Sequence, residues 1–377
     1  MLPWLLVGGL VAAAIVVLLY QGWAILLAYQ MPPLRPDPAA APGRSVGVVI
    51  AARDEDDELL ATLDALTAQT VPIAEVVVVD GGSSEATRRE LERRAPAVRR
   101  LEEPPLPAGW VGKNWACWTG AQSVRGEWIL FLDADVQLHP SAVGSMVAWA
   151  EREGAAAATI APRIVALGFW ERVVLPFYVQ MVLARYRAPR TNLDRSRSAL
   201  LNGQCWLARR EAYAAVGGHA AVRGQVLEDI ALATRFRAAG DRLRLAWAPG
   251  LASTRMYRDR AEMFEGLVKN IHGVAFSVPQ ELGFLAVLIG MFWLPLALLP
   301  FGWAIGSVPL AGLGAFLYVA LFGKHVAFAR STGVPAAYGL LFPLAVAFYV
   351  AVLVTSLGRG LRRRPVTWKG RAYPIRP

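Results

Sequence analysis

Apolar residues fill both ends of this chain of 377 residues and leave a charged region between them. The first run, Met1 to Tyr29, contains no charged residue and is longer than the roughly 20 residues that an α-helix needs to cross a bilayer. It lacks the short apolar core and small-residue cleavage site of a signal peptide. We therefore expect a retained membrane anchor at 1–30, followed by an extended Pro/Ala-rich linker at 31–43.

A second apolar region follows residue 280, and we expect a C-terminal membrane region at 281–358. Three segments in it are long enough to span a bilayer: 282–306, 308–328 and 336–357. The tail at 359–377 holds seven Lys or Arg residues and no acid, which predicts a cytoplasmic tail.

The positive charges also restrict how many of these segments cross. Arg35 and Arg44 predict that the anchor ends in the cytoplasm, so a cytoplasmic tail requires an even number of later crossings. One segment is therefore expected to be re-entrant or interfacial, and we choose 282–306 because Pro295 and Pro300 interrupt it.

The composition agrees with a membrane protein. A hydrophobic content of 55% with 18% charged residues is too apolar for an ordinary soluble enzyme and excludes intrinsic disorder. Two cysteines, Cys117 and Cys205, exclude a disulfide-rich scaffold. The formal net charge of +10 is concentrated in the tail, beside an apolar span, so we expect a lipid bilayer rather than nucleic acid as its partner.

The middle region, 44–280, alternates strand and helix signals. Ser45 to Ala51 is a β-branched apolar run, 56–69 has helical spacing, and 73–80 is a second buried-strand run, which together predict a parallel βαβ unit. A third strand is expected at 128–132. Further helices are expected at about 85–94, 140–152 and 209–216. The Gly-rich fingerprints of dinucleotide-binding and P-loop folds do not occur.

Acidic residues follow all three predicted strands. They are Asp54 and Glu55 after the first, Asp80 after the second, and Asp133 and Asp135 after the third. The carboxyl ends of parallel strands face the ligand crevice, although a single acid there also serves as a helix cap or turn former. Two carboxylates around one small residue suit Mg²⁺ or Mn²⁺, which completes its shell with phosphate oxygens. The sequence therefore predicts a nucleoside diphosphate ligand.

Two other motifs carry chemistry. Gly109 to Trp115 is predicted as a Gly-flanked loop that offers Lys113 to phosphate; the alternative is a surface loop with a solvated lysine. Glu228 and Asp229 lie in an apolar stretch, which suits a general base with a tuned pKa; the alternative is an acid pair at a helix N-terminus. Residues 167–187 are either a helix at the membrane interface or a core helix with charged ends.

In order and spacing these motifs resemble the membrane-anchored members of glycosyltransferase family 2, from about Ser45 to the tail. The resemblance implies a GT-A fold, which is Rossmann-like α/β with a mainly parallel sheet and helices on both faces. It also implies a nucleotide-sugar donor such as a UDP- or GDP-sugar, a divalent metal, Mg²⁺ or Mn²⁺, and inversion at the anomeric carbon.

Roles are carried over from the family by motif. Ala52, Asp54, Glu55, Asp80, Lys113 and Asp133 would bind the nucleotide-sugar, with Lys113 at the diphosphate. Asp133 and Asp135 would hold the metal. Asp229 would be the catalytic base, with Glu228 beside it. His219 is a further candidate for the site.

Residues 255–257, 269–270 and 368–371 resemble the carotenoid- and hopanoid-associated branch of the family. Processive synthases carry a QxxRW motif, whose counterpart here, 266–270, lacks both Gln and Trp. We therefore expect transfer of one or a few sugars to a membrane lipid, such as a carotenoid, hopanoid or other polyprenoid, by a multi-pass protein at the cytoplasmic face of the cell (inner) membrane. The alternatives are a processive polysaccharide synthase and a non-catalytic GT-A-like membrane scaffold.

Overall fold

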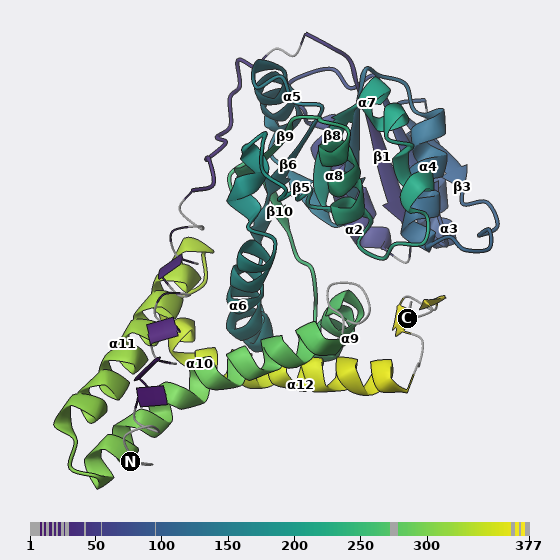
Figure 1. Ribbon diagram of the computed structural model, residues 1–377. Helices are drawn as coiled ribbons and strands as arrows, with labels where there is room; N and C mark the ends of the chain where they lie inside the picture. Colours follow the sequence, from purple (N-terminus) through teal and green to yellow (C-terminus); the bar gives the residue numbers. More distant parts are fainter. Residues whose placement is uncertain are drawn as a thin grey trace.

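The computed structural model describes residues 30–362 apart from 41–42, 54, 95 and 272–277, together with scattered positions between 8 and 26 and the stretches 366–368 and 371–373. The predicted anchor and much of the basic tail therefore lie outside the described residues. An α/β domain stands on a group of long apolar helices (Figure 1).

A seven-stranded sheet forms the centre of the α/β domain, in the order β3-β2-β1-β4-β8-β6-β9. Its strands are β1 (Val46–Ala52), β2 (Glu75–Asp80), β3 (Val98–Glu102), β4 (Trp128–Asp133), β6 (Ala157–Ala161), β8 (Cys205–Arg209) and β9 (Leu243–Trp247). Strand β8 runs antiparallel to both neighbours, whereas the other pairs are parallel.

Helices cover both faces of this sheet. One face packs against α2 (Asp56–Thr67), α3 (Glu85–Arg93) and α5 (Ala142–Arg152). The opposite face packs against α4 (Gly112–Ser123), α7 (Arg210–Ala215) and α8 (Glu228–Ala238). The predicted α/β class, with a mainly parallel sheet between two helical layers, is confirmed.

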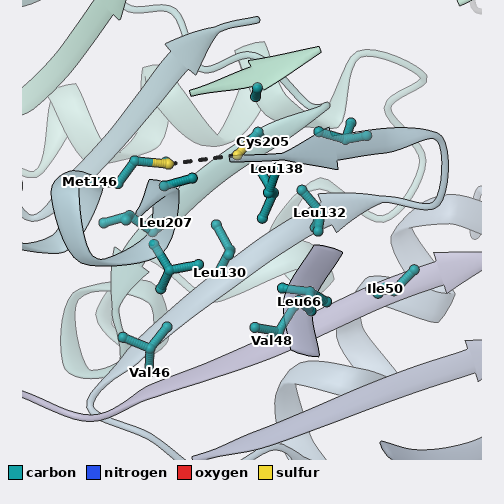
Figure 2. Packing of buried hydrophobic residues seen from close by; sticks show 14 of the residues in the cluster. Val46, Val48, Ile50, Leu66, Leu130, Leu132, Leu138, Met146, Cys205 and Leu207 are labelled. Atoms are coloured by element: carbon teal, nitrogen blue, oxygen red, sulfur yellow. Dashed lines mark hydrogen bonds between the residues drawn. The ribbon is translucent and has the colours of Figure 1, made fainter. Parts of the chain in front are cut away.

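Alternation along the strands explains the two layers. In β1, Val48 and Ile50 lie in one hydrophobic core and Val49 lies in the other, because successive side chains of a strand point to opposite faces. Strands buried on both faces read as continuous apolar runs, as β1 does. Figure 2 shows one of these cores, where the Cys205 thiol contacts the Met146 sulfur at 3.8 Å.

Other elements depart from the sequence predictions. The predicted loop at 109–115 is helical from Gly112, so Lys113 lies in the first turn of α4. The antiparallel strand β8 and the edge strand β3 were not predicted. Shorter elements complete the domain: β5 (Val136–Leu138), β7 (Arg163–Ile164), β10 (Ala252–Thr254), η1 (Ala188–Asn192) and η2 (Gly218–Val222). Strands β5, β10 and β7 form a separate small sheet.

Three helices after residue 277 are long and apolar enough to cross a membrane. They are α10 (Val278–Ala304), α11 (Val308–Ser331) and α12 (Phe342–Leu361), the last preceded by η3 (Ala336–Leu341). Helices α10 and α11 form a close hairpin, in which Gly302 and Gly314 leave no room for a side chain between the two backbones. A short hairpin of β11 (Val366–Trp368) and β12 (Arg371–Tyr373) follows.

Helices α6 (Phe169–Arg185) and α9 (Arg260–Ile271) join the α/β domain to the apolar helices. Val174 and Phe177 of α6 share one hydrophobic core with Leu267 of α9 and Val352 of α12. These contacts favour the core alternative for residues 167–187. This core ties α6 and α9 to the apolar helices and is separate from the two cores that flank the central sheet.

Candidate active site

A cavity of about 630 Å³ begins at the carboxyl ends of β1 and β4 and reaches the apolar helices. The first half is lined by Ala52, Glu55, Lys113, Asp133, Asp135, Glu228 and Asp229. The structure therefore gathers seven of the predicted site residues around one space. Asp54 is outside the described residues.

Asp133 and Asp135 lie at the end of β4 and in the turn before β5. The Oδ2 atom of Asp135 accepts a hydrogen bond from Thr254 Oγ1 at 2.9 Å, and Thr254 is held in register by the β10–β5 pairing. Burial and the charge of Asp133 together raise the pKa of Asp135 to about 7. The two acids form a negative, partly buried site that faces the cavity.

Lys113 connects the two acidic motifs. Its Nζ atom lies 2.7 Å from Asp133 Oδ1 and 3.3 Å from Glu228 Oε1. Burial opposes its charge, but the Asp133 and Glu228 carboxylates raise the pKa of Lys113 well above its usual range. This lysine is charged and sits between the predicted metal site and the predicted base.

Asn114 follows Lys113 and fixes the approach to α8. Its buried Nδ2 donates to the carbonyl oxygens of Val222 at 2.8 Å and Gln225 at 2.9 Å. These carbonyls belong to the segment that leads into Glu228. Asn114 therefore helps to set the position of the acid pair relative to Lys113, a role that the sequence analysis did not identify.

Asp229 lies in the first turn of α8. Its Oδ2 atom accepts a hydrogen bond from the backbone N–H of Gly203 at 2.8 Å, and its Oδ1 accepts one from the N–H of Ile230. Burial and the charge of Glu228 raise the pKa of Asp229 to about 7, although Lys113 and these hydrogen bonds act in the opposite direction. A carboxylate with this pKa suits a general base near neutral pH.

Gly203 packs closely against Asp229. A Cβ atom at this position would lie 3.0 Å from Asp229 Oδ2 and 3.3 Å from Lys113 Nζ. Gly203 and Gln204 line the cavity.

Asp80 does not line the main cavity but a smaller one of about 250 Å³. Its carboxylate accepts hydrogen bonds from the backbone N–H groups of Gly82 at 3.1 Å and Ser83 at 2.8 Å, and from Arg100 Nε at 2.7 Å. Burial works against its charge, but these hydrogen bonds lower the pKa of Asp80 to about 2. The contacts described for Asp80 hold the loop after β2 in place. Arg53 and Glu103 line both cavities.

His219 belongs to the core and not to the site. It is 1% exposed, and its Nδ1 lies 2.7 Å from the Tyr213 hydroxyl. Burial and the charge of Lys113 lower the pKa of His219 to about 3, so its imidazole is neutral. Its proposed contribution to the site is wrong because the side chain points into the hydrophobic layer beside Phe131.

The second half of the cavity contains residues that the sequence analysis did not assign. They come from α6, α9, the apolar helices and the segments that directly follow α6, β10 and α11: Tyr178, Tyr186, Tyr257, Asn270, Phe284, Thr332 and Tyr349. Arg255, noted only as part of a branch-specific motif, pairs with Glu171 at 2.8 Å and so ties the end of β10 to the start of α6. Tyr257 and Asn270 lie in the stretches 255–257 and 269–270 that resemble the carotenoid- and hopanoid-associated branch, whereas no short motif marks the others.

Comparison with known proteins supports the family. Residues 47–217 match the model of Glycosyl transferase family 2. A 4,4'-diaponeurosporenoate glycosyltransferase of Staphylococcus haemolyticus (strain JCSC1435) is 24% identical over 248 residues, which are 65% of this chain and 66% of that protein. The protein of the same name from Staphylococcus aureus (strain USA300) is 22% identical over 350 residues, which are 88% of this chain and 89% of that protein.

Among solved structures, a mannosyltransferase from Pyrobaculum calidifontis in complex with GDP-Man and Mn²⁺ superposes with a TM-score of 0.51. The two chains are 19% identical, and the match covers 94% of this chain and 97% of the other. This likeness extends the agreement in fold beyond the α/β domain to the apolar helices. The chain is therefore a glycosyltransferase with a GT-A fold, and its residues 47–217 are a Glycosyl transferase family 2 domain.

Proposed function

We propose that this protein is an inverting glycosyltransferase that moves a sugar from a nucleotide-sugar donor to a membrane lipid at the cytoplasmic face. A carotenoid, a hopanoid or another polyprenoid-type lipid is the proposed acceptor. The relatives named for a carotenoid-derived acceptor support this choice.

The single observation that carries the proposal is the continuity of the cavity. One space of about 630 Å³ joins Asp133 and Asp229 to Phe284 of α10, Thr332 at the end of α11 and Tyr349 of α12. A polar donor can reach the carboxylates from water, whereas an apolar acceptor can reach them from the helices that would contact lipid. A soluble acceptor would not need walls built from such helices.

The donor set of the first half fits a divalent metal. Among the described residues no group of three or more His, Cys, Asp or Glu side chains is gathered for a metal. Mg²⁺ and Mn²⁺ do not require one, because one or two carboxylates plus substrate phosphates hold them in nucleotide sites. Asp133 and Asp135 would hold the ion, with Thr254 orienting Asp135. When bound, the ion would neutralise charge on the diphosphate.

Three side chains of the protein take part in the transfer reaction itself. Lys113 places a positive charge beside Asp133, where it can stabilise the negative diphosphate as it departs. Asp229 accepts the proton of the acceptor hydroxyl while that oxygen attacks the anomeric carbon. The new C–O bond forms on the face opposite the diphosphate, and the old C–O bond breaks with its electron pair leaving on the diphosphate. Glu228 keeps Lys113 close to Asp229.

We also propose that α10 and α11 cross the membrane and that α12 lies along the cytoplasmic interface. In the segment Ala336–Leu361, which includes α12, 50% of the most apolar stretch is buried inside the protein. In α10 the buried share of the corresponding stretch is 18%. Arg359 of α12 pairs with Glu265 of α9 at 3.0 Å, and such a charged partner belongs near water. Two crossings return the tail to the cytoplasm, so α12 replaces 282–306 as our choice of non-crossing segment.

Cysteine labelling tests this arrangement. A Cys introduced at Ser307, in the α10–α11 turn, should react with a membrane-impermeant maleimide from outside, and a Cys introduced at Arg376 should react only from the cytoplasm. Cys117 and Cys205 are buried and supply a low background. Labelling of position 376 from outside would show that α12 crosses.

The activity test is release of nucleoside diphosphate by the purified protein in native lipid extract, with UDP- and GDP-sugars and Mn²⁺ or Mg²⁺. Release that needs both metal and a lipid fraction is expected, and Asp133→Ala should abolish it. If no donor binds or is turned over, the scaffold alternative is preferred. If a water-soluble polymer accumulates without added lipid, the processive alternative is preferred.

A further inference from the structure

The Pro/Ala-rich linker is bound along the edge of the α/β domain. The backbone N–H of Trp247, the last residue of β9, donates to the carbonyl oxygen of Pro32 at 2.9 Å, and the N–H of Leu34 donates to the carbonyl oxygen of Trp247 at 3.0 Å. These two bonds form a parallel β-bridge between Pro33 and Trp247. Proline fits there because this pairing does not need the N–H of the bridging residue. The linker therefore adds a short pairing to the edge of the seven-stranded sheet.

Two further contacts fix the linker on α5. The backbone N–H of Asp37 donates to Ser145 Oγ at 2.9 Å. Gly144 packs against Ala40, whose carbonyl oxygen would lie 3.1 Å from a Cβ atom at position 144. Because the backbone is held at β9 and again on α5, the linker follows a defined path, and Met31 at its start has a defined place.

Met31 is buried in an apolar cluster that borders the main cavity. Its side chain is 7% exposed. The cluster contains residues of the linker, of α6, of the segment before β8, and of β9, and Ile230 of α8 packs against it. We use the name linker chamber for the part of the cavity lined by Met31, Leu183, Leu200, Ile230, Leu245 and Trp247.

The linker chamber begins beside the candidate base. Ile230 follows Asp229 in α8, and its backbone N–H donates to Asp229 Oδ1 at 2.8 Å. Leu200 precedes the turn in which the N–H of Gly203 donates to Asp229 Oδ2 at 2.8 Å. A group bound in the chamber would thus lie next to Asp229. The hydroxyls of a donor sugar need polar partners, so the apolar chamber suits the acceptor instead.

Two apolar segments that could enter a membrane end beside the chamber. Phe328 of α11 packs against the same cluster, and residues 330–334, at the end of α11, line the cavity. Met31 directly follows the anchor predicted at 1–30. Val11, one of the described positions before residue 30, packs against a cluster formed by α10 and α11. The position of the chamber therefore favours an apolar ligand that arrives from the bilayer.

We propose that the linker chamber binds the apolar chain of the lipid acceptor next to its reacting group, and that Met31 is a specificity-determining residue for this chain. This inference rests on the proposed function. It adds the part of the protein that recognises the acceptor, and it gives the linker a role other than that of a spacer between the anchor and the domain.

Met31→Ala tests the contact, with Leu34→Ala as the matched control. Both variants remove an apolar side chain of the linker, but Leu34 packs against the core shared with α5 and does not line the cavity. The measurement is the concentration of native lipid extract that gives half-maximal release of nucleoside diphosphate. We expect Met31→Ala to raise it roughly 10-fold, as for the loss of much of one buried apolar contact.

Leu34→Ala should leave this concentration unchanged, and metal-dependent nucleotide binding should be unchanged in both variants. An unchanged value in Met31→Ala would overturn the contact. An equal rise in both variants would overturn it as well, because it would show that the effect comes from loosening of the linker.

A polyprenol that carries a diazirine near its hydroxyl end locates the chain directly. Irradiated with the full-length protein in lipid nanodiscs, it should label Met31, Leu183 or Trp247. Met31→Trp should reduce labelling of the other two, because the larger side chain would fill the chamber. Labelling only outside the chamber, as at Phe284 and Tyr349, or none at all, would overturn the inference while leaving the proposed glycosyl transfer intact. Failure of the wild-type protein to use any donor would instead reject the proposed function.

Discussion

The Nζ atom of Lys113 lies 2.7 Å from Oδ1 of Asp133. This contact joins the first turn of α4 to the end of β4, and the second contact of Lys113, with Glu228, extends the connection to α8. Three elements that are distant in sequence thus meet at one cation. A bound diphosphate would enter a site where a positive charge is already in place.

Replacing Lys113 should weaken donor binding. Lys113→Met removes a charged hydrogen-bond donor, so we expect nucleoside diphosphate affinity to fall roughly 10- to 100-fold in isothermal titration with Mn²⁺ present. Lys113→Arg keeps the charge and should lose less. Equal affinity for wild type and Lys113→Met would exclude a diphosphate role for this lysine.

The pKa of Asp229 predicts how transfer depends on pH. A general base works in its deprotonated form, so activity should rise as the pH increases through about 7 and should level off above it. Asp229→Asn should lower transfer to a hydroxyl acceptor by at least about 10². The measurement is the pH profile of kcat/KM with saturating metal. A profile that rises only near pH 4 would show that Asp229 is not the titrating base.

The same pKa predicts a stability effect of opposite sign. In the unfolded chain Asp229 titrates near its ordinary value of about 4, whereas in the folded protein it titrates near 7. The folded state therefore binds the proton more tightly, and stability decreases as the pH rises from about 4 to about 7. Asp229→Asn should melt a few degrees higher at pH 8, on the order of the shift produced by 1 kcal/mol or more.

Little difference is expected between wild type and Asp229→Asn at pH 4, where the wild-type carboxyl is protonated when folded. Tryptophan fluorescence in lipid nanodiscs would follow both transitions. A variant that melts lower at pH 8 would mean that the Asp229 charge is stabilised in the folded protein.

Asp80 should matter mainly for stability. Its folded pKa of about 2 lies below the unfolded value of about 4, so its contribution is present above pH 4 and is lost as the pH falls through about 2. Asp80→Asn breaks the pair with Arg100 and should cost roughly 1–3 kcal/mol at pH 7. Denaturant unfolding measures this. An unchanged stability with a higher donor KM would support the nucleotide-sugar contact predicted for Asp80 from the sequence.

Much of the site was predictable because its residues follow buried strands or form short motifs. Asp133 and Asp135 come directly after β4, and parallel strands bring such residues to one edge of a sheet. Lys113 and Asp229 occur in motifs that are compact in sequence. Their predicted positions around one cavity agree with the structure.

The acceptor side was not predictable for a physical reason. Tyr178, Asn270 and Tyr349 are brought together by the packing of α6, α9 and α12, and the spacing of residues within one helix does not specify which helix lies opposite. Strand β8 was missed for a related reason, since an antiparallel insertion depends on a long connection that returns from α6.

Helices that are long and apolar enough to cross a membrane also form one wall of the cavity, so under the proposed function the membrane region would help to define the acceptor. If the acceptor is a lipid, exchange of cavity-lining residues on α10 or α12 would change which lipid is used while the carboxylates stay the same. Substitutions in the membrane segments of related enzymes would then change their acceptor specificity. The same feature means that a version trimmed at residue 280 for easier purification would lack the part of the cavity wall that we propose selects the acceptor.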